Sequence, residues 1–184
     1  MDHLGFLHEM EKATGEKISA CYQCYKCTTG CPVVADMDIY PHRIIRHIIL
    51  GNKDRVLGSR TIWTCLQCTT CSVRCPNDID VARIFSALRK MSVREGRAAE
   101  RDTWRFDEIF LESVQRHGRL NELGAILRYK IDKKDLFSDT KMGMGMVKKG
   151  RIGLMPHNIR DRKGMEEIFR KAAETGKRGS GEKE

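Results

Sequence analysis

The residues most able to do chemistry in this sequence are its eight cysteines, which fall into two groups of the same spacing. Each group reads C-x2-C-x2-C-x3-C-P, and each cysteine of the second group lies 44 positions after its counterpart in the first. Thiolates are soft ligands that suit iron–sulfur clusters and zinc. The repeated spacing therefore predicts bound metal on Cys21, Cys24, Cys27 and Cys31, followed by Pro32, and on Cys65, Cys68, Cys71 and Cys75, followed by Pro76.

The spacing indicates two [4Fe–4S] clusters. Three thiolates at every third residue can wrap one short loop around a cubane, and the fourth iron then needs a thiolate from elsewhere. In two-cluster ferredoxins that thiolate comes from the other motif. Crossed ligands would hold the clusters close together, as electron relay requires. We therefore predict cluster 1 on Cys21, Cys24, Cys27 and Cys75, and cluster 2 on Cys65, Cys68, Cys71 and Cys31.

Three other uses of the cysteines are weaker. Structural zinc takes four ligands per ion from paired C-x2-C units, which leaves the third cysteine, the proline and the full repetition unexplained. Disulfides are disfavoured in the reducing cytosol where we expect this chain. A redox-active pair such as Cys21 and Cys24 would compete with ligation, which already uses every cysteine. A zinc-stabilised interaction or nucleic-acid-binding protein is kept as a third interpretation.

The composition predicts a soluble, basic protein. The chain has 184 residues, of which 32% are charged, and a formal net charge of +9. Its basic residues are scattered and no helix-turn-helix or RNA-binding signature appears, which argues against nucleic acid and leaves acidic protein partners as one use of the charge. The longest apolar stretch, residues 44–50, is too short to span a membrane. No secretory signal opens the sequence, so we expect a cytoplasmic protein.

Helical patterns dominate the rest of the sequence, and no strand is strongly predicted. Helices are expected over residues 4–14, 101–117, 120–128 and 164–175. A helical pattern also follows each motif. Compact ferredoxins instead place the same motifs on a small β-rich fold. The sequence therefore predicts a mainly α fold, an α-helical ferredoxin-type module. Its apolar stripes are Ile44, Ile45, Ile48 and Ile49 after the first motif, and Val81, Ile84, Phe85, Leu88 and Met91 after the second.

We predict three regions along the chain. Residues 1–100 form the two-cluster domain, with the motifs at residues 21–32 and 65–76. Residues 101–175 form a helical extension. This extension includes a methionine- and glycine-rich segment at residues 141–156, which is either a flexible loop or an adaptable docking segment. Residues 176–184 form a disordered tail.

With these motifs and helices, the sequence resembles HdrC, the iron–sulfur subunit of heterodisulfide reductase from methanogenic archaea. The resemblance rests on the motifs CYQCYKCTTGCP and WTCLQCTTCSVRCP and on the helical phrase after each. It extends to RLNELGAILRYKI and KKGRIGLMPHNI downstream, and covers about residues 10–173. The cysteine motifs alone fit many iron–sulfur proteins, so the two downstream segments are what point to this family.

The resemblance implies an electron-transfer role within an oxidoreductase complex. Such a chain takes electrons from a flavin-containing A-type subunit. It passes them to a B-type subunit, which holds noncubane clusters and reduces the heterodisulfide of coenzyme M and coenzyme B in methanogenesis. The complex also includes a nickel–iron hydrogenase or a formate dehydrogenase.

All eight ligands carry over from the resemblance, and no catalytic residue is implied for this chain. The alternative is the same role in another oxidoreductase, one that acts on glycolate, fumarate or a thiol-linked substrate.

Overall fold

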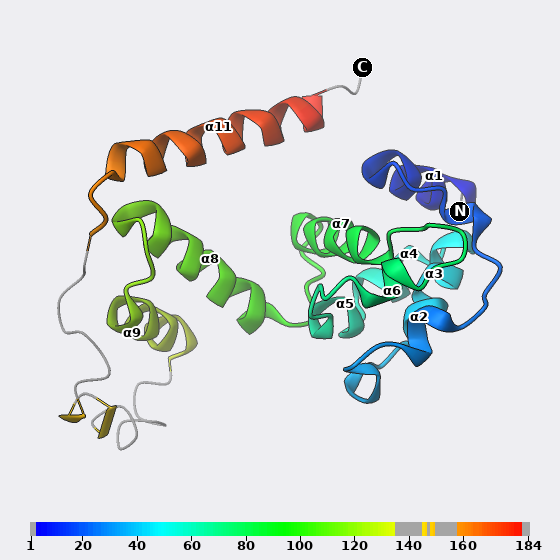
Figure 1. Cartoon of the computed structure of the whole chain (residues 1–184), viewed down its shortest axis with the longest axis horizontal. Helices are drawn as coiled ribbons and strands as arrows, with labels where there is room; N and C mark the ends of the chain where they lie inside the picture. Colours follow the sequence, from blue (N-terminus) through cyan, green and yellow to red (C-terminus); the bar gives the residue numbers. More distant parts are fainter. Residues whose placement is uncertain (1–2, 135–144, 147, 150–157, 182–184) are drawn as a thin grey trace. The chain divides into compact units, whose positions relative to one another are not determined.

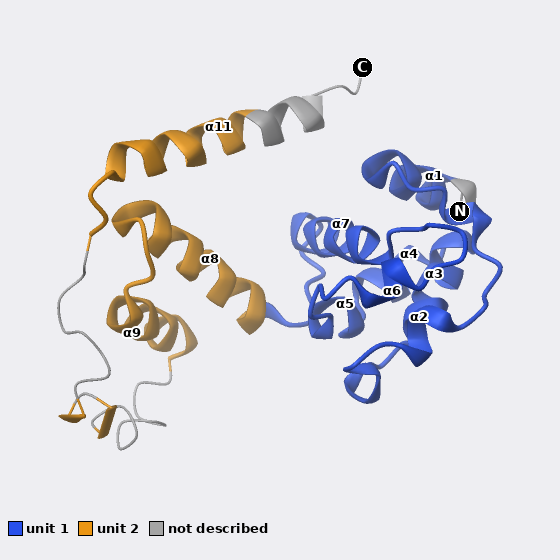
Figure 2. Ribbon diagram, viewed as in Figure 1, with its two compact units in different colours: residues 1–101 blue, residues 102–184 orange. Residues whose placement is uncertain are grey.

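The computed structural model describes residues 3–134, 145–146, 148–149 and 158–181 (Figure 1). Over these residues the chain is helical or irregular and has no strand, which confirms the mainly α fold. Figure 2 shows its two compact units, Met1–Arg101 (unit 1) and Asp102–Glu184 (unit 2). Both cysteine motifs belong to unit 1.

Three longer helices build the frame of unit 1: α1 (His3–Thr14), α3 (Pro41–Ile49) and α7 (Val81–Arg94). Helix α1 packs against both α3 and α7. The motifs lie in the connections between these helices. The connections contain η1 (Ile18–Ala20), α2 (Lys26–Thr29), η2 (Val34–Asp36), α4 (Lys53–Leu57), α5 (Thr61–Thr64) and α6 (Thr70–Val73).

The predicted apolar stripes form the core of unit 1. All five stripe residues of α7 are buried, and so are Ile44, Ile45 and Ile48 of α3, whereas Ile49 is half-buried. Met10 of α1 and Ile62 of α5 are fully buried as well. Burying one such side chain contributes about 1.5–3 kcal/mol, so this core fixes the two helices that follow the motifs.

The ends of α3 and α7 follow the signals in the sequence. Helix α3 begins at Pro41, whose fixed φ and missing N–H suit a first turn. Helix α7 begins after Asp80, whose side chain accepts a hydrogen bond from the backbone N–H of Arg83. Gly51 (φ +72°) and Gly96 (φ +66°) follow their C-terminal ends in left-handed conformations. Local sequence therefore sets where each motif ends and each helix starts.

Unit 2 contains α8 (Arg101–His117), α9 (Glu122–Lys133) and α11 (Arg162–Gly181). The rings of Phe106 and Tyr129 join α8 and α9 edge to face, with centroids 5.7 Å apart. An ion pair of 2.6 Å between Arg105 and Asp132 joins the same helices. Their packing is therefore both apolar and electrostatic.

Two predictions for the second half of the chain need comment. The methionine- and glycine-rich segment at residues 141–156 lies largely outside the described residues, so its docking role stays a prediction. Helix α11 continues to Gly181 and so includes residues 176–181, for which the sequence predicts disorder. Once a helix has begun, each added residue loses its conformational freedom but gains one backbone hydrogen bond. This hydrogen bond offsets the weak helix propensity of the glycines. No helix in the described part of the chain is long and apolar enough for a membrane span.

Candidate iron–sulfur site

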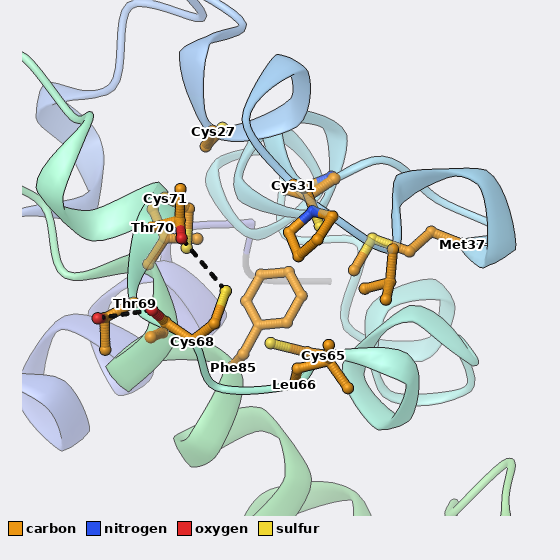
Figure 3. Close-up of a pocket in the computed structure, with 15 residues that line it drawn as sticks. Cys27, Cys31, Met37, Cys65, Leu66, Cys68, Thr69, Thr70, Cys71 and Phe85 are labelled. Carbon is orange, nitrogen blue, oxygen red and sulfur yellow. Dashed lines mark hydrogen bonds between the residues drawn. The ribbon is translucent and has the colours of Figure 1, made fainter.

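The eight cysteines line two neighbouring cavities of unit 1, and each cavity takes residues from both motifs. All eight are free thiols, of which Cys24 and Cys68 are exposed. Cys27 lines both cavities. The first cavity is lined by Cys21, Cys24, Cys27 and Cys75. The second cavity is lined by Cys31, Cys65, Cys68 and Cys71, together with Cys27 (Figure 3). In each, three cysteines of one motif therefore meet the last cysteine of the other.

The crossing follows from how the two repeats pack. The short helices α2 and α6 occupy equivalent positions, 44 residues apart, and they contact each other directly. Cys31 follows α2 and Cys75 follows α6. The last cysteine of each motif is thus brought to the loop of the other motif.

The loops repeat an uncommon backbone conformation. Gln23 (φ +61°) and Gln67 (φ +55°) are equivalent residues in the left-handed region, as are Tyr25 (φ +68°) and Thr69 (φ +59°). Non-glycine residues seldom adopt this conformation, and it clusters at functional sites. A left-handed residue next to a right-handed one is also the backbone pattern of anion-binding loops. The strain therefore coincides with the sites that must surround an anionic group.

Two glutamines donate hydrogen bonds to sulfur, and sequence reasoning missed both. Gln23 Nε2 lies 3.4 Å from Cys21 Sγ, and Gln67 Nε2 lies 3.7 Å from Cys65 Sγ. Ser86 of α7 donates to Gln67 Oε1 over 2.9 Å and so orients that amide. Hydrogen bonds to ligand sulfurs tune the reduction potential of a cluster. The available signal was the glutamine repeated in C-Y-Q-C and C-L-Q-C.

Two equivalent hydroxyls tie the motifs to the helices that follow them. Thr28 Oγ1 accepts from the backbone N–H of His42 over 3.2 Å and lies 2.7 Å from His42 Nδ1. Ser72 Oγ accepts from the N–H of Ala82 over 3.2 Å and donates to Asp80 over 2.6 Å. The first turns of α3 and α7 are therefore held beside the cysteine loops.

Asp38, which follows the first motif, is hydrogen-bonded to the segment that precedes the second motif. Its carboxylate accepts from Ser59 Oγ (2.7 Å), from Thr61 Oγ1 (2.7 Å) and from the backbone N–H groups of Arg60 (3.1 Å) and Thr61 (2.9 Å). Burial alone would raise the pKa of Asp38, but the hydrogen bonds from Thr61 and Ser59 outweigh it and lower the pKa to about 2. Helix α5 begins at Thr61 and leads into Cys65, so Asp38 positions the second motif.

Arg89 of α7 holds the end of α5 from the other side. Its guanidinium donates to the carbonyl of Trp63 over 3.2 Å and also to the carbonyls of Ile62 and Cys65. These carbonyls lie at the C-terminal end of a helix, where a cation is favourable. Cys65 is therefore fixed through its own backbone.

The thiols differ in acidity because their burial differs. Burial raises the pKa of the Cys27 thiol to about 11, and it raises the pKa of Cys65 and of Cys71. Hydrogen bonds with Thr70 lower the pKa of the exposed Cys68 thiol. These half-buried thiols stay protonated at neutral pH until a metal displaces the proton, so cluster binding must release protons.

The chemistry of the cavity walls fits iron–sulfur clusters. Each cavity offers four thiols in the crossed set, the donor type that holds such clusters. The rest of the second cavity is mostly apolar, and Figure 3 shows the ring of Phe85 among Cys31, Cys65 and Cys68. Tyr22 and Tyr25 beside the first loop are exposed, and the ring of Tyr25 packs against that of His42 with centroids 4.2 Å apart.

Comparison with known families decides the kind of cofactor. Residues 20–80 match the 4Fe-4S dicluster domain, a family whose model spans both motifs. The cofactors are two [4Fe–4S] clusters. Within this dicluster domain the predictions of cofactor and fold are confirmed. Which cysteine binds which cluster stays a prediction, which the two cavities support.

The chain is similar to curated iron–sulfur components of archaeal heterodisulfide reductases. It is 36% identical over 104 residues to the C2 subunit of the H(2)/formate:CoB-CoM heterodisulfide,ferredoxin reductase of Methanococcus maripaludis, covering 52% of this chain and 56% of that protein. It is 38% identical over 84 residues to the second C-type iron-sulfur subunit of the CoB--CoM heterodisulfide reductase of Methanocaldococcus jannaschii, covering 46% and 45%. A third relative is the C-type subunit of the Ferredoxin:CoB-CoM heterodisulfide reductase of Methanosarcina acetivorans, 36% identical over 84 residues, covering 46% and 34%.

These relatives confirm the resemblance that the motifs suggested. The chain spans about half the length of the first two relatives and a third of the last one. The matches cover 46–52% of this chain, less than the residues 10–173 over which the sequence suggested the resemblance.

Proposed function

We propose that this chain is the iron–sulfur electron-transfer subunit of a heterodisulfide reductase complex. Its clusters would relay electrons from a flavin-containing A-type subunit to a catalytic B-type subunit that reduces the coenzyme M–coenzyme B heterodisulfide. The observation that carries the proposal is the crossed arrangement of cysteines around two neighbouring cavities. Two clusters in neighbouring cavities can pass an electron from one to the other, whereas a structural zinc ion has no redox chemistry.

The residues of the chain would hold and tune the clusters. Each [4Fe–4S] cluster accepts one electron and gives it up again without bond breaking. In our assignment Cys21, Cys24, Cys27 and Cys75 bind cluster 1, and Cys65, Cys68, Cys71 and Cys31 bind cluster 2. Apolar residues such as Phe85 exclude water from the sulfurs, while Gln23 and Gln67 donate hydrogen bonds to them. No bound substrate is needed for this role.

Each cluster would have its own contact with the surface. Cys24 and Cys68 are the exposed cysteines, and they are the second ligands of cluster 1 and cluster 2 in our assignment. An electron can therefore enter through the cluster next to one of them and leave through the cluster next to the other. This arrangement suits a subunit that lies between two redox partners.

The names of the relatives support the choice of complex. Two of them act with ferredoxin, and one with dihydrogen or formate, on the CoB–CoM heterodisulfide, as their names state. We propose that this chain likewise works in a cytoplasmic complex with the flavin-containing and catalytic subunits of the reductase. A nickel–iron hydrogenase or formate dehydrogenase would complete the complex.

The test is anoxic isolation of the chain from its native source with every protein that co-elutes. We expect about eight irons per chain, paramagnetic signals after dithionite reduction, and flavin-containing and catalytic reductase subunits in the same fractions. Recovery with an oxidoreductase that acts on glycolate or fumarate would assign the relay to that enzyme instead. About two zinc ions per chain and no colour would overturn the relay itself.

A further inference from the structure

Gly30 and Arg74 are equivalent residues of the repeat, and they meet each other. Arg74 lies 44 positions after Gly30, each is the C-cap residue that follows its short helix, and each directly precedes the last cysteine of its motif. A Cβ atom on Gly30 would lie 2.8 Å from Cδ and 3.1 Å from Cζ of Arg74. The guanidinium of Arg74 thus packs on the backbone of Gly30, where α2 and α6 are in contact.

The glycine is required for space and not for backbone conformation. Gly30 has φ −96° and ψ −2°, an ordinary right-handed conformation that any residue adopts. Arg74 has nearly the same conformation, with φ −85° and ψ −3°. Two long side chains at these equivalent positions would collide, so one repeat carries the arginine and the other leaves room for it.

This packing connects Arg74 to the last cysteine of each motif. Arg74 is bonded to Cys75, which belongs to cluster 1 in our assignment, and its side chain lies on the neighbour of Cys31, which belongs to cluster 2. Among the described residues no carboxylate forms an ion pair with Arg74, whereas Arg83 and Arg97 of the same unit each have one. The charge of Arg74 is therefore not neutralised by a neighbour.

We propose that Arg74 is a shared electrostatic tuning residue that raises the reduction potentials of both clusters, and that the absence of a side chain at Gly30 leaves room for Arg74. This inference rests on the proposed relay. A cubane with four thiolates carries roughly −2 and becomes more negative by one electron on reduction, with no bond broken. A nearby cation stabilises the reduced state more than the oxidised state. It also weakens the repulsion between the clusters when both are reduced.

The experiment is an EPR-monitored redox titration of the reconstituted full chain and of its variants. Arg74→Gln should lower both midpoint potentials, with about a two- to fivefold decrease in each equilibrium constant for reduction, as expected for an exposed charge. The shift should shrink as the salt concentration rises, because salt screens exposed charges. Arg74→Lys should restore most of it, and Arg97→Gln, which removes the same net charge elsewhere in the unit, should leave both potentials unchanged.

Gly30→Ala provides the sharper test because it leaves the net charge unchanged. The added methyl group must displace the flexible end of Arg74, so Gly30→Ala should lower both potentials in the same direction as Arg74→Gln. In the double variant the two effects should not add, since the alanine acts only through the arginine. Iron content checks that each variant holds both clusters.

The outcomes separate this inference from the proposed function. A wild-type chain without clusters would overturn the relay. A wild-type chain with two clusters whose potentials are unaffected by Arg74→Gln, or a double variant with fully additive shifts, would overturn the role of Arg74 alone.

Discussion

Thr61 gives two hydrogen bonds to Asp38, one from its hydroxyl over 2.7 Å and one from its backbone N–H over 2.9 Å. These bonds join the segment after the first motif to the helix that leads into the second. The crossed cavities require the two motifs to keep a fixed relation, and unit 1 maintains it through this contact as well as through the packing of α2 on α6.

Asp38→Asn should destabilise the cluster-loaded chain by about 1–3 kcal/mol, because hydrogen bonds from four donors to a carboxylate become weaker or unmatched. Urea unfolding measures this, with Asp36→Asn as the control, since the Asp36 carboxylate, two residues earlier, accepts no hydrogen bond from the described residues. The lowered pKa means that the carboxylate stabilises the fold fully above its ordinary pKa and loses that effect only as the pH falls toward about 2. The difference from wild type should therefore be constant from about pH 5 to 8. A difference that varies across this range would contradict the assignment of the effect to Asp38.

Pairs of cysteine substitutions test the crossed ligands by counting iron. Cys31→Ala combined with Cys68→Ala should remove one cluster and leave about four irons, because both residues are assigned to cluster 2. Cys31→Ala combined with Cys24→Ala should remove both clusters. If each motif instead bound its own cluster, the first pair of substitutions would remove both clusters and the second pair would remove one. Cys75→Ala, combined with the same two partners in turn, provides the matched control from the other motif.

The two glutamines should each tune one cluster. Gln23→Met removes the donor to Cys21, and Gln67→Met removes the donor to Cys65, while each keeps an unbranched side chain of similar length. Loss of one hydrogen bond should lower one potential by about 20–60 mV, the equivalent of roughly 0.5–1.5 kcal/mol for one electron. The shift should be nearly independent of salt, unlike that of Arg74→Gln. Equal shifts of both potentials in either single variant would argue against separate tuning.

Removal of iron should sharply lower the thermal stability of unit 1. In our assignment the clusters cross-link the two motifs, and half-buried thiols such as Cys27 must give up their protons to bind them. Circular dichroism of the anoxic full chain, before and after chelation, should show a large drop in melting temperature and a broader transition. An apo chain that melts at the same temperature and as cooperatively as the loaded one would show that the apolar core is sufficient.

Much of the frame was predictable because its signals are local. The helix starts are marked by Pro41 and Asp80, and the helix ends by Gly51 and Gly96. The apolar stripe of α7 is buried, as its helical spacing predicts. The cysteine spacing predicted both the cofactor and the crossed lining of the cavities, since three closely spaced thiolates leave one coordination site for a distant one.

The finer parts of the site depend on contacts between distant residues. Two examples are the hydrogen bond between Thr61 and Asp38 and the packing of Arg74 on Gly30, which both form only when the two repeats pack together. Phe106 and Phe110 share the apolar side of α8 with Ile109, yet both are exposed while Ile109 is buried. Periodicity shows that a helix has an apolar face, and does not show how much of that face a neighbour covers.

The equivalence of the repeats has a consequence for shorter versions of the molecule. With the proposed ligands, one repeat supplies three thiolates to its own cavity and the fourth to the other cavity, so a peptide that contains a single repeat completes neither cluster alone. Two such peptides could complete two clusters by exchanging their last cysteines, as partners in a symmetric dimer. In the present chain the covalent link makes that exchange internal, and it allows the halves to diverge, so that glycine in one can face arginine in the other.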